Sequence, residues 1–213
     1  MEFIAEEILK YCEIMSSPES VLLQELNRDT YAKVLNPRML SGHLQGRFLA
    51  MLSQMLQPKT ILEIGTYTGY SALCLCEGLQ PDGKLITIDI NDELESFSKK
   101  YFSASKWASQ IIQKTGNALE IIPLLPNTFD LVFIDADKEE YIRYYDLIID
   151  KVRSGGIIIA DNVLWSGHVL KPAEKQDLET RSIAAFNSKV RSDDRVSLTM
   201  LPIRDGLSLI RKK

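Results

Sequence analysis

A short apolar run, a glycine turn and a second apolar run constrain this chain more than any other feature. Residues 61–64 are apolar apart from Glu63 and lead into Gly65, which is typical of a buried parallel strand. Gly65 and Gly69 turn the chain, and residues 71–76 favour a helix. A strand, a turn and a helix N-terminus direct free backbone N–H groups and the helix dipole at one point. The sequence therefore predicts an anion-binding turn here.

The spacing of the two glycines limits which anion fits. A dinucleotide site uses G-x-G-x-x-G, so that the backbone can approach a pyrophosphate. Here the pattern is Glu63-x-Gly65-x-x-x-Gly69, and Thr66 and Tyr67 occupy the space that a pyrophosphate needs. The turn better suits the carboxylate of an amino-acid moiety, whose ammonium Glu63 can accept. An ordinary strand–helix turn without a ligand is the alternative.

An acid at the end of the next predicted strand extends this interpretation. Residues 84–89 form an apolar run that ends in Asp89, about twenty residues after Gly69. A carboxylate there can accept hydrogen bonds from a ribose diol. An adenosine that carries a methionine tail matches both features.

Composition places the chain among globular proteins. It has 213 residues, of which 45% are hydrophobic and 25% charged, and a formal net charge of −4. No long basic run occurs, so we expect no nucleic-acid partner. No signal peptide or membrane span is expected, which makes the cytoplasm the predicted location. Three cysteines fit a reducing compartment, and we expect Cys74 and Cys76 to pack in the core.

The order of elements predicts an α/β fold. Amphipathic helices are expected over residues 2–15 and after Ser17-Pro18, with Ser17 as the cap of the second. Alternating strands and helices follow, and two final strands are joined by residues 202–206. This order predicts a doubly wound, mostly parallel, seven-stranded sheet with an antiparallel terminal hairpin. We expect one domain, with residues 1–56 as a helical cap and residues 57–213 as the α/β core.

Two segments near the predicted turn have open interpretations. Residues 36–43 lead into a helix expected from about Leu44 to Leu56, and Met39 and Ser41 can line the methionine end of a ligand. Ser41 as a helix N-cap is the alternative. Ala118 follows the third predicted strand and can contact adenine, or it can simply be a good helix former in a first turn.

Acids and an amide follow two further apolar strands. Asp135 follows the strand that ends at Ile134, and Asp161 and Asn162 follow the next strand. In open α/β sheets ligands bind beyond the carboxyl ends of the strands. Two carboxylates and an amide oxygen suit Mg²⁺, Mn²⁺ or Ca²⁺. The alternative is that Asp135 and Asp161 are helix caps.

These segments together resemble the metal-dependent catechol and caffeoyl-CoA O-methyltransferase family, and lean toward its caffeoyl-CoA and bacterial branch. The matching segments run in the family's order from residue 39 onward: Met39-Leu-Ser-Gly42, Leu62-Glu-Ile-Gly-Thr-Tyr-Thr-Gly-Tyr-Ser71, Asp82-Gly-Lys-Leu-Ile-Thr-Ile-Asp89, Phe129-Asp-Leu-Val-Phe-Ile-Asp-Ala-Asp-Lys138, Gly156-Ile-Ile-Ile-Ala-Asp-Asn-Val-Leu-Trp165 and Asp205-Gly-Leu207. One departure is Ser166, where plant relatives typically carry an Asn.

The resemblance implies a role for each matching residue. S-adenosylmethionine would be bound by Met39, Ser41, Glu63, Gly65, Thr66, Tyr67, Ser71, Asp89, Ala118 and Asp135. A divalent cation would be bound by Asp135, Asp161 and Asn162, and the acceptor would be bordered by Asp137, Lys138, Trp165 and Asp205. Lys138 and Asp135 would act in catalysis, Lys138 as the base that takes the acceptor proton, which needs a lowered pKa beside the cation.

Two functions from different classes follow. The first is an enzyme that methylates one hydroxyl of a vicinal diphenol with the help of a divalent cation, and that works as a homodimer. The second is a nucleoside-binding or scaffold domain on the same fold with a non-catalytic site. The predicted metal ligands favour the enzyme, because a binder has no evident use for them. The glycine spacing argues against a third option, an NAD-dependent dehydrogenase.

Overall fold

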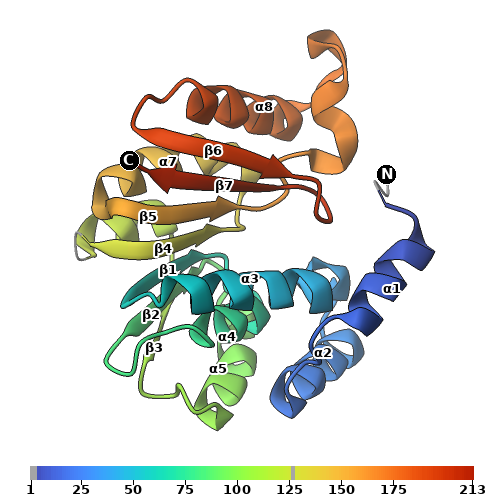
Figure 1. Cartoon of the computed structure of the whole chain (residues 1–213), viewed down its shortest axis with the longest axis vertical. Helices are drawn as coiled ribbons and strands as arrows, with labels where there is room; N and C mark the ends of the chain where they lie inside the picture. The colour runs from blue at the N-terminus through green and yellow to red at the C-terminus, as the bar shows by residue number, and fades with distance from the viewer. Residues whose placement is uncertain (1–3, 126–127) are drawn as a thin grey trace. The chain divides into compact units, whose positions relative to one another are not determined.

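Parallel strands followed by helices build both parts of this chain in the computed structural model, which describes residues 4–125 and 128–213 (Figure 1). The chain divides into two units, residues 4–117 and residues 118–213. Each unit has its own strands and helices, and its own cluster of buried polar side chains.

The first unit contains three strands and five α-helices. Its elements are α1 (Glu6–Met15), α2 (Val21–Lys33), α3 (Gly42–Leu56), β1 (Thr60–Ile64), α4 (Tyr70–Cys76), β2 (Lys84–Asp89), α5 (Glu95–Ala104) and β3 (Ile111–Thr115), with short 3-10 turns at Pro37–Met39 and Asp92–Leu94. β2 lies between β1 and β3 and is parallel to both. The register pairs Glu63 with Thr87 and Asp89 with Thr115, so the polar residues of neighbouring strands face a common end.

The turn between β1 and α4 requires a glycine at one position. Gly69 has a φ of +91°, and a Cβ atom there would lie 2.6 Å from the Phe102 ring. Its backbone N–H donates to the Thr66 carbonyl over 2.8 Å. A side chain at this position would meet both backbone strain and a steric clash. The tight turn therefore depends on Gly69.

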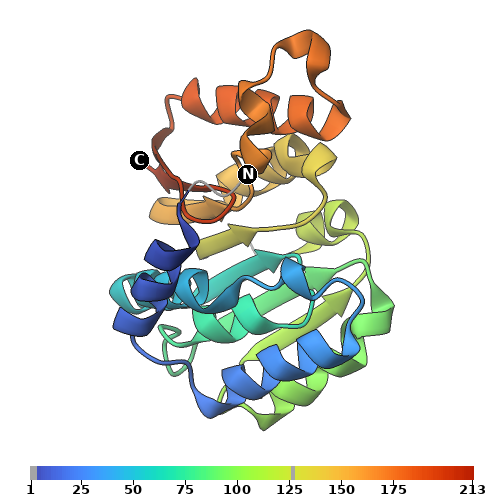
Figure 2. The ribbon, with the colours of Figure 1, turned by 90° about the vertical axis from the view of Figure 1, so that its right-hand side faces the viewer.

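The N-terminal helices differ from the expectation in one cap and in what they bury. Ser20, not Ser17, caps α2, and its side chain accepts the Leu23 N–H over 3.3 Å. The helix begins at Val21 and Ser20 before it has an extended backbone, so the cap lies three residues later than predicted. α2 lies beside α5 (Figure 2), and Tyr101 donates to Asp29 over 2.7 Å between them. α1 buries none of its residues.

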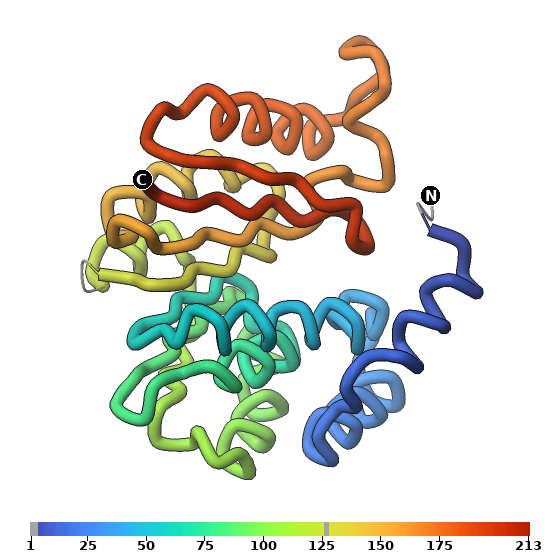
Figure 3. Tube along the Cα trace, viewed as in Figure 1, coloured from blue at the N-terminus to red at the C-terminus, as the bar shows by residue number. Residues whose placement is uncertain are grey.

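The second unit contains four strands and three α-helices. Its elements are α6 (Ala118–Ile121), β4 (Phe129–Ile134), α7 (Tyr141–Ile148), β5 (Val152–Ala160), α8 (Leu178–Arg191), β6 (Val196–Leu201) and β7 (Leu207–Lys212), with 3-10 turns at Ile122–Leu124, Lys138–Glu140, Ile149–Lys151, Trp165–Leu170 and Ala173–Lys175. β4 and β5 are parallel, and Ile134 pairs with Ala160 at their carboxyl ends. β7 lies between β5 and β6 and is antiparallel to both (Figure 3), which confirms the terminal hairpin.

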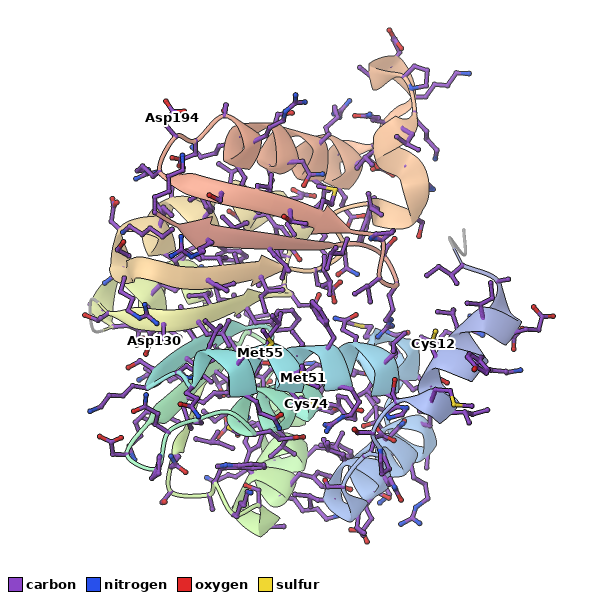
Figure 4. The ribbon with its side chains drawn as sticks, viewed as in Figure 1. Cys12, Met51, Met55, Cys74, Asp130 and Asp194 are labelled. Carbon is purple, nitrogen blue, oxygen red and sulfur yellow. The ribbon has the colours of Figure 1, made fainter. Side chains whose placement is uncertain are left out.

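The interior of each unit is apolar as the periodicity predicts. Figure 4 marks Cys74 within the first unit, and both Cys74 and Cys76 are fully buried, as expected of core residues. Burial is the main reason that the pKa of Cys74 is raised to about 12. Within the described ranges, no helix has both the length and the apolar character that crossing a membrane requires.

Candidate active site

The first unit holds a chain of buried hydroxyls and a carboxylate at its strand ends. Thr87 Oγ1 donates to Glu63 Oε2 over 2.6 Å, and Thr66 Oγ1 lies 2.5 Å from Thr87 Oγ1. All three side chains are at most 2% exposed. A buried carboxylate is costly unless it is hydrogen-bonded, and this chain of hydroxyls provides one such bond, to Oε2 of Glu63. The anion-binding turn is therefore anchored through Thr66 to the strand beneath it.

Asp89 is fixed by the same turn. Its Oδ2 accepts the Tyr67 N–H over 2.6 Å, and its Oδ1 accepts the Asn91 N–H over 2.9 Å. The carboxylate is thus held in one orientation at the end of β2, as a ribose-binding acid needs to be. Each oxygen has a second lone pair with which it can accept a further hydrogen bond.

Tyr67 joins the turn to the segment that precedes α3. Its backbone has a φ of +48°, and its hydroxyl donates to the Asn36 carbonyl over 2.8 Å. The same carbonyl accepts the Met39 N–H over 3.0 Å. Burial, followed by the neighbouring Tyr31, raises the pKa of the Tyr67 hydroxyl, which therefore keeps its proton as a donor.

The remaining cofactor candidates of the first unit surround this turn. Ser71 lies in the first turn of α4 and is 7% exposed, whereas Met39 is 61% exposed. Ser41 is buried and stands at the N-cap position of α3, as the alternative interpretation has it, but its side chain makes no capping hydrogen bond. Gly65 has a φ of +102°, and its N–H donates to the Ile88 carbonyl over 2.8 Å.

Two cofactor candidates belong to the second unit. Ala118 begins α6 and is 8% exposed. Asp135 follows β4 and belongs to the charged cluster described next. The implied role of every cofactor residue stays a prediction, because the structure gives their positions without a ligand.

A charged cluster occupies the carboxyl ends of β4 and β5. Ile134 and Ala160 are paired, and the Asp161 N–H donates to the Ile134 carbonyl over 3.0 Å. Asp135 and Asp161 therefore follow neighbouring strands at the same level. Asp161 Oδ1 accepts the Asn162 N–H over 2.7 Å, and Asn162 adopts a φ of +57°.

Lys138 lies at the centre of this cluster. Its Nζ donates to Asp135 Oδ1 and to Tyr141 Oη, each over 3.0 Å. The Tyr141 hydroxyl in turn donates to the Asp161 carbonyl over 3.1 Å. Tyr141 is fully buried and the Lys138 side chain is 12% exposed. One lysine thus connects the ends of both strands.

The neighbours of Lys138 in the chain raise the pKa of its ammonium group. Burial by itself would lower the pKa of this ammonium group, but the charges and hydrogen bonds of Tyr141 and Asp135 outweigh burial and raise it above its ordinary value. The residues of the chain by themselves therefore do not give Lys138 the lowered pKa that a base needs. As an ammonium group, Lys138 can hold an ionised hydroxyl oxygen.

Asp137 is the cap residue of this region. Its side chain accepts the Glu139 N–H over 3.1 Å at the start of the Lys138–Glu140 turn. Asp135 and Asp161 cap no described helix, so the capping alternative is wrong for these two residues. They are left as candidates for ligand chemistry.

The donor set fits a hard cation by its chemistry. Asp135 and Asp161 supply carboxylate oxygens and Asn162 supplies an amide oxygen, which are ligands that Mg²⁺ and Ca²⁺ accept. Within residues 4–125 and 128–213, no group of three or more His, Cys, Asp or Glu side chains is arranged to hold a metal ion. The predicted set has only two such side chains, so its third ligand would have to be the amide.

Trp165 and Asp205 lie on the loop side of the cluster. The Trp165 ring centroid is 6.0 Å from Lys138 Nζ, and the Tyr141 ring centroid is 5.1 Å from it. Asp205 is in the turn between β6 and β7, and its side chain accepts the Ser166 N–H. The predicted acceptor residues Lys138 and Trp165 are therefore neighbours in the structure.

Sequence reasoning missed two residues that organise these clusters. Thr87 was counted only as part of an apolar strand, although it pairs with Glu63 in register. Tyr141 lies three residues after Lys138, a spacing at which helical side chains meet. A polar residue opposite Glu63 and the Lys-x-x-Tyr spacing were the available signals.

Parallel strands with polar clusters at their carboxyl ends define an α/β protein that binds ligands at those ends. A family model described as O-methyltransferase matches residues 13–213. A curated relative, caffeoyl-CoA O-methyltransferase 2 of Eucalyptus globulus, is 36% identical over 209 residues, which cover 92% of this chain and 82% of the relative. The chain therefore belongs to the O-methyltransferase family, and the family identified from the motifs is confirmed.

Solved structures confirm the expected fold class. The SAH-bound methyltransferase of Podospora anserina matches with a TM-score of 0.90 and 28% identity, covering 98% of this chain and 94% of that one. The O-methyltransferase of Bacillus cereus in complex with SAH matches with a TM-score of 0.89 and 28% identity, covering 97% of each chain. The fold is the mostly parallel, seven-stranded sheet with antiparallel final strands that the element order predicts.

Proposed function

We propose that this protein transfers a methyl group from S-adenosylmethionine to one hydroxyl of a vicinal diphenol, assisted by a divalent cation. One observation supports the proposal most directly. Lys138 Nζ lies 3.0 Å from Asp135 Oδ1 beyond the carboxyl end of β4, and Asp161 and Asn162 follow the neighbouring parallel strand β5. A cationic side chain beside oxygen ligands suits a reaction in which a hydroxyl must ionise.

The donor is proposed from the first unit and from the relatives. The matched structures of Podospora anserina and Bacillus cereus contain SAH, the product that the donor leaves behind. In this chain, the fixed carboxylate of Asp89 supports hydrogen bonds to a ribose. Glu63 supports binding of the ammonium group of the methionine moiety, and the Gly65–Gly69 turn supports binding of its carboxylate.

The cation is proposed from the donor set of the second unit. Asp135, Asp161 and Asn162 would hold it through oxygen atoms. When bound, such an ion lowers the pKa of hydroxyls that chelate it. A vicinal diphenol offers two neighbouring oxygens and so suits this site better than a single phenol.

The chain's own residues would position and polarise the acceptor. Lys138 would hold the reacting oxygen by charge and hydrogen bonding, or would take its proton; Trp165 would border the ring. The donor would supply a methyl group on a positively charged sulfur: the acceptor oxygen would take the methyl group, and the electrons of the C–S bond would stay with the sulfur of the SAH that leaves. Most of the rate enhancement would come from alignment of the two reactants.

The test is a methyl-transfer assay with a labelled donor and a matched pair of acceptors. We expect transfer to 3,4-dihydroxybenzoate and little to 4-hydroxybenzoate, which lacks the second oxygen. Excess EDTA should abolish transfer while circular dichroism stays unchanged, and Mg²⁺ or Mn²⁺ should restore it. Undiminished transfer in EDTA would contradict the role of the cation. Donor binding without transfer to any of a panel of catechols would favour a binding domain instead.

We also propose that the protein acts as a homodimer. The apolar side chains of α1 lack cover within their unit: Ile8, Tyr11, Ile14 and Met15 are each 56–75% exposed. A second copy would remove this apolar surface from water. Sedimentation equilibrium at micromolar concentration should give about twice the 24.1 kDa chain mass. Replacing Tyr11 and Ile14 by Ser should shift the equilibrium to monomer, and a monomeric unmodified chain would contradict the proposal.

A further inference from the structure

The loop after β5 has an unusual backbone for its sequence. Trp165 and Ser166 have φ values of +46° and +51°, a region that non-glycine side chains disfavour. Such conformations are energetically unfavourable and persist only where the surroundings fix them. The surroundings of this loop should therefore contain the groups that hold it.

The turn between β6 and β7 supplies those groups. The Leu164 N–H donates to the Asp205 carbonyl over 2.9 Å, and the Val163 N–H donates to the Gly206 carbonyl over 3.2 Å. The Asp205 carboxylate accepts the Ser166 N–H. Three hydrogen bonds thus join two segments that lie about forty residues apart in the chain.

Close packing leaves this junction little freedom. Gly206 has a φ of +91°, and a Cβ atom there would lie 2.5 Å from Leu164 Cγ. On the other side of the loop, Asn187 of α8 donates to the Val163 carbonyl over 2.8 Å. The backbone of residues 163–166 is therefore held from two directions, and Asp205 provides the only side-chain hydrogen bond described to the Ser166 N–H.

The residue so held is Trp165. Its ring lies 6.0 Å from Lys138 Nζ, within the range of a cation–π contact. We propose that Asp205 is a positioning residue, which acts through the Ser166 backbone to keep the Trp165 ring beside Lys138. It sets the orientation of the acceptor without touching it. This inference rests on the proposed function, in which Trp165 borders the acceptor.

Two roles for Asp205 predict different behaviour of its variants. A positioning role needs an acceptor oxygen at the right distance, which Asp205→Asn keeps and Asp205→Glu displaces. A direct electrostatic contact with the acceptor needs the charge, which Asp205→Glu keeps and Asp205→Asn removes. Asp177→Ala is the matched control, because Asp177 also binds a backbone N–H, that of Thr180, at the start of α8.

The first measurement does not depend on turnover. In a Trp107→Phe background, Trp165 is the remaining tryptophan of the chain and reports its own surroundings. We expect Asp205→Ala and Asp205→Glu to increase acrylamide quenching of Trp165 and to lower its anisotropy. Asp205→Asn and Asp177→Ala should match the Trp107→Phe parent. Unchanged quenching in Asp205→Ala and Asp205→Glu would overturn the proposal.

The second measurement uses kinetics. Displacement of the Trp165 ring in Asp205→Ala and Asp205→Glu should lower kcat/KM for the diphenol roughly 10–100-fold. Donor affinity should stay unchanged. The ratio of the two monomethylated products should move toward equality. Asp205→Asn should lose clearly less activity than Asp205→Ala, and an equal loss in the two variants would overturn the proposal. Absence of transfer by the unmodified protein would refute the proposed function but leave the fluorescence test intact.

Discussion

The two units hold their polar groups in different ways. In residues 4–117, Glu63, Thr66 and Thr87 are buried and form one chain of hydrogen bonds. In residues 118–213, Lys138 bridges Asp135 and Tyr141, and these partners belong to a more exposed cluster beside a strained loop. The first arrangement suits a ligand of fixed shape, and the second suits groups that must exchange protons or ligands. This difference indicates that the second unit is the part of the protein that can accommodate different acceptors.

Of the variants proposed, Lys138→Ala should have the largest effect, and it should affect mainly the function of the second unit. Removing the ammonium group should lower the methyl-transfer rate roughly 10²–10⁴-fold, because the acceptor hydroxyl loses its neighbouring charge or base. Donor affinity, measured by calorimetry, should fall far less than the rate, because most of the proposed donor-binding residues belong to the other unit. The loss should shrink as pH rises and the hydroxyl ionises unaided. A donor affinity that falls in parallel with the rate would contradict the division of labour.

Lys138→Arg separates the two roles of the lysine in that experiment. Arginine keeps the positive charge but does not act as a base near neutral pH. If charge is what matters, Lys138→Arg should recover much of the rate that Lys138→Ala loses. A rate as low as that of Lys138→Ala would assign proton transfer to Lys138.

Asp89→Ala should affect donor binding instead. Loss of hydrogen bonds to a charged group costs about 1–3 kcal/mol, which is roughly a 5–150-fold weaker donor affinity. The Km for the acceptor should change little. Asp92→Ala, which alters an exposed acid three residues away, is the control and should leave donor affinity as it is. An equal loss of donor affinity in both variants would mean that negative charge in this region matters, and not the hydrogen bonds of Asp89.

Thr87→Val should lower stability. The variant keeps the shape of the side chain but removes the donor to Glu63, so a buried carboxylate loses a 2.6 Å bond. We expect a decrease of about 1–3 kcal/mol in the free energy of unfolding by urea. Thr199→Val, at an exposed position of β6, should change stability far less. Equal stability of the two variants would mean that the hydroxyl chain does not anchor the turn.

The smallest effect concerns the cysteines of the first unit. Burial raises the pKa of Cys74 to about 12, so at pH 8 the group is a thiol and not the reactive thiolate. Ellman's reagent should therefore modify only the half-exposed Cys12 in the folded protein. Cys74 and Cys76 should react after unfolding in guanidinium chloride. Rapid modification of all three thiols in the folded state would show that the first unit opens easily.

Local pattern predicts much of this molecule. The apolar runs before Gly65, Asp135 and Asp161 are strands, and the family motifs identify the O-methyltransferase family. What pattern does not give is pairing across the sheet. Thr87 bonds Glu63 because two parallel strands are in register, and no local signal gives that register.

The same dependence on contacts that the local sequence does not encode explains three details that pattern fails to predict. Ser17 and Ser20 both precede the second helix, and only the observed backbone distinguishes which of them is the cap. The pKa of Lys138 depends on Tyr141 and Asp135 together, so neither residue type alone indicates its direction. The bond between Asp205 and Ser166 spans 39 residues and has no sequence signature.

The position of β7 between β5 and β6 has a consequence for how the protein is made. β6 is synthesised before β7 but pairs with it, and β5 also pairs with β7. While the chain emerges from the ribosome, the edges of both earlier strands are open until residues 207–212 appear. Such edges are templates for wrong association. We therefore expect wrong association of the nascent second unit to begin at these two edges.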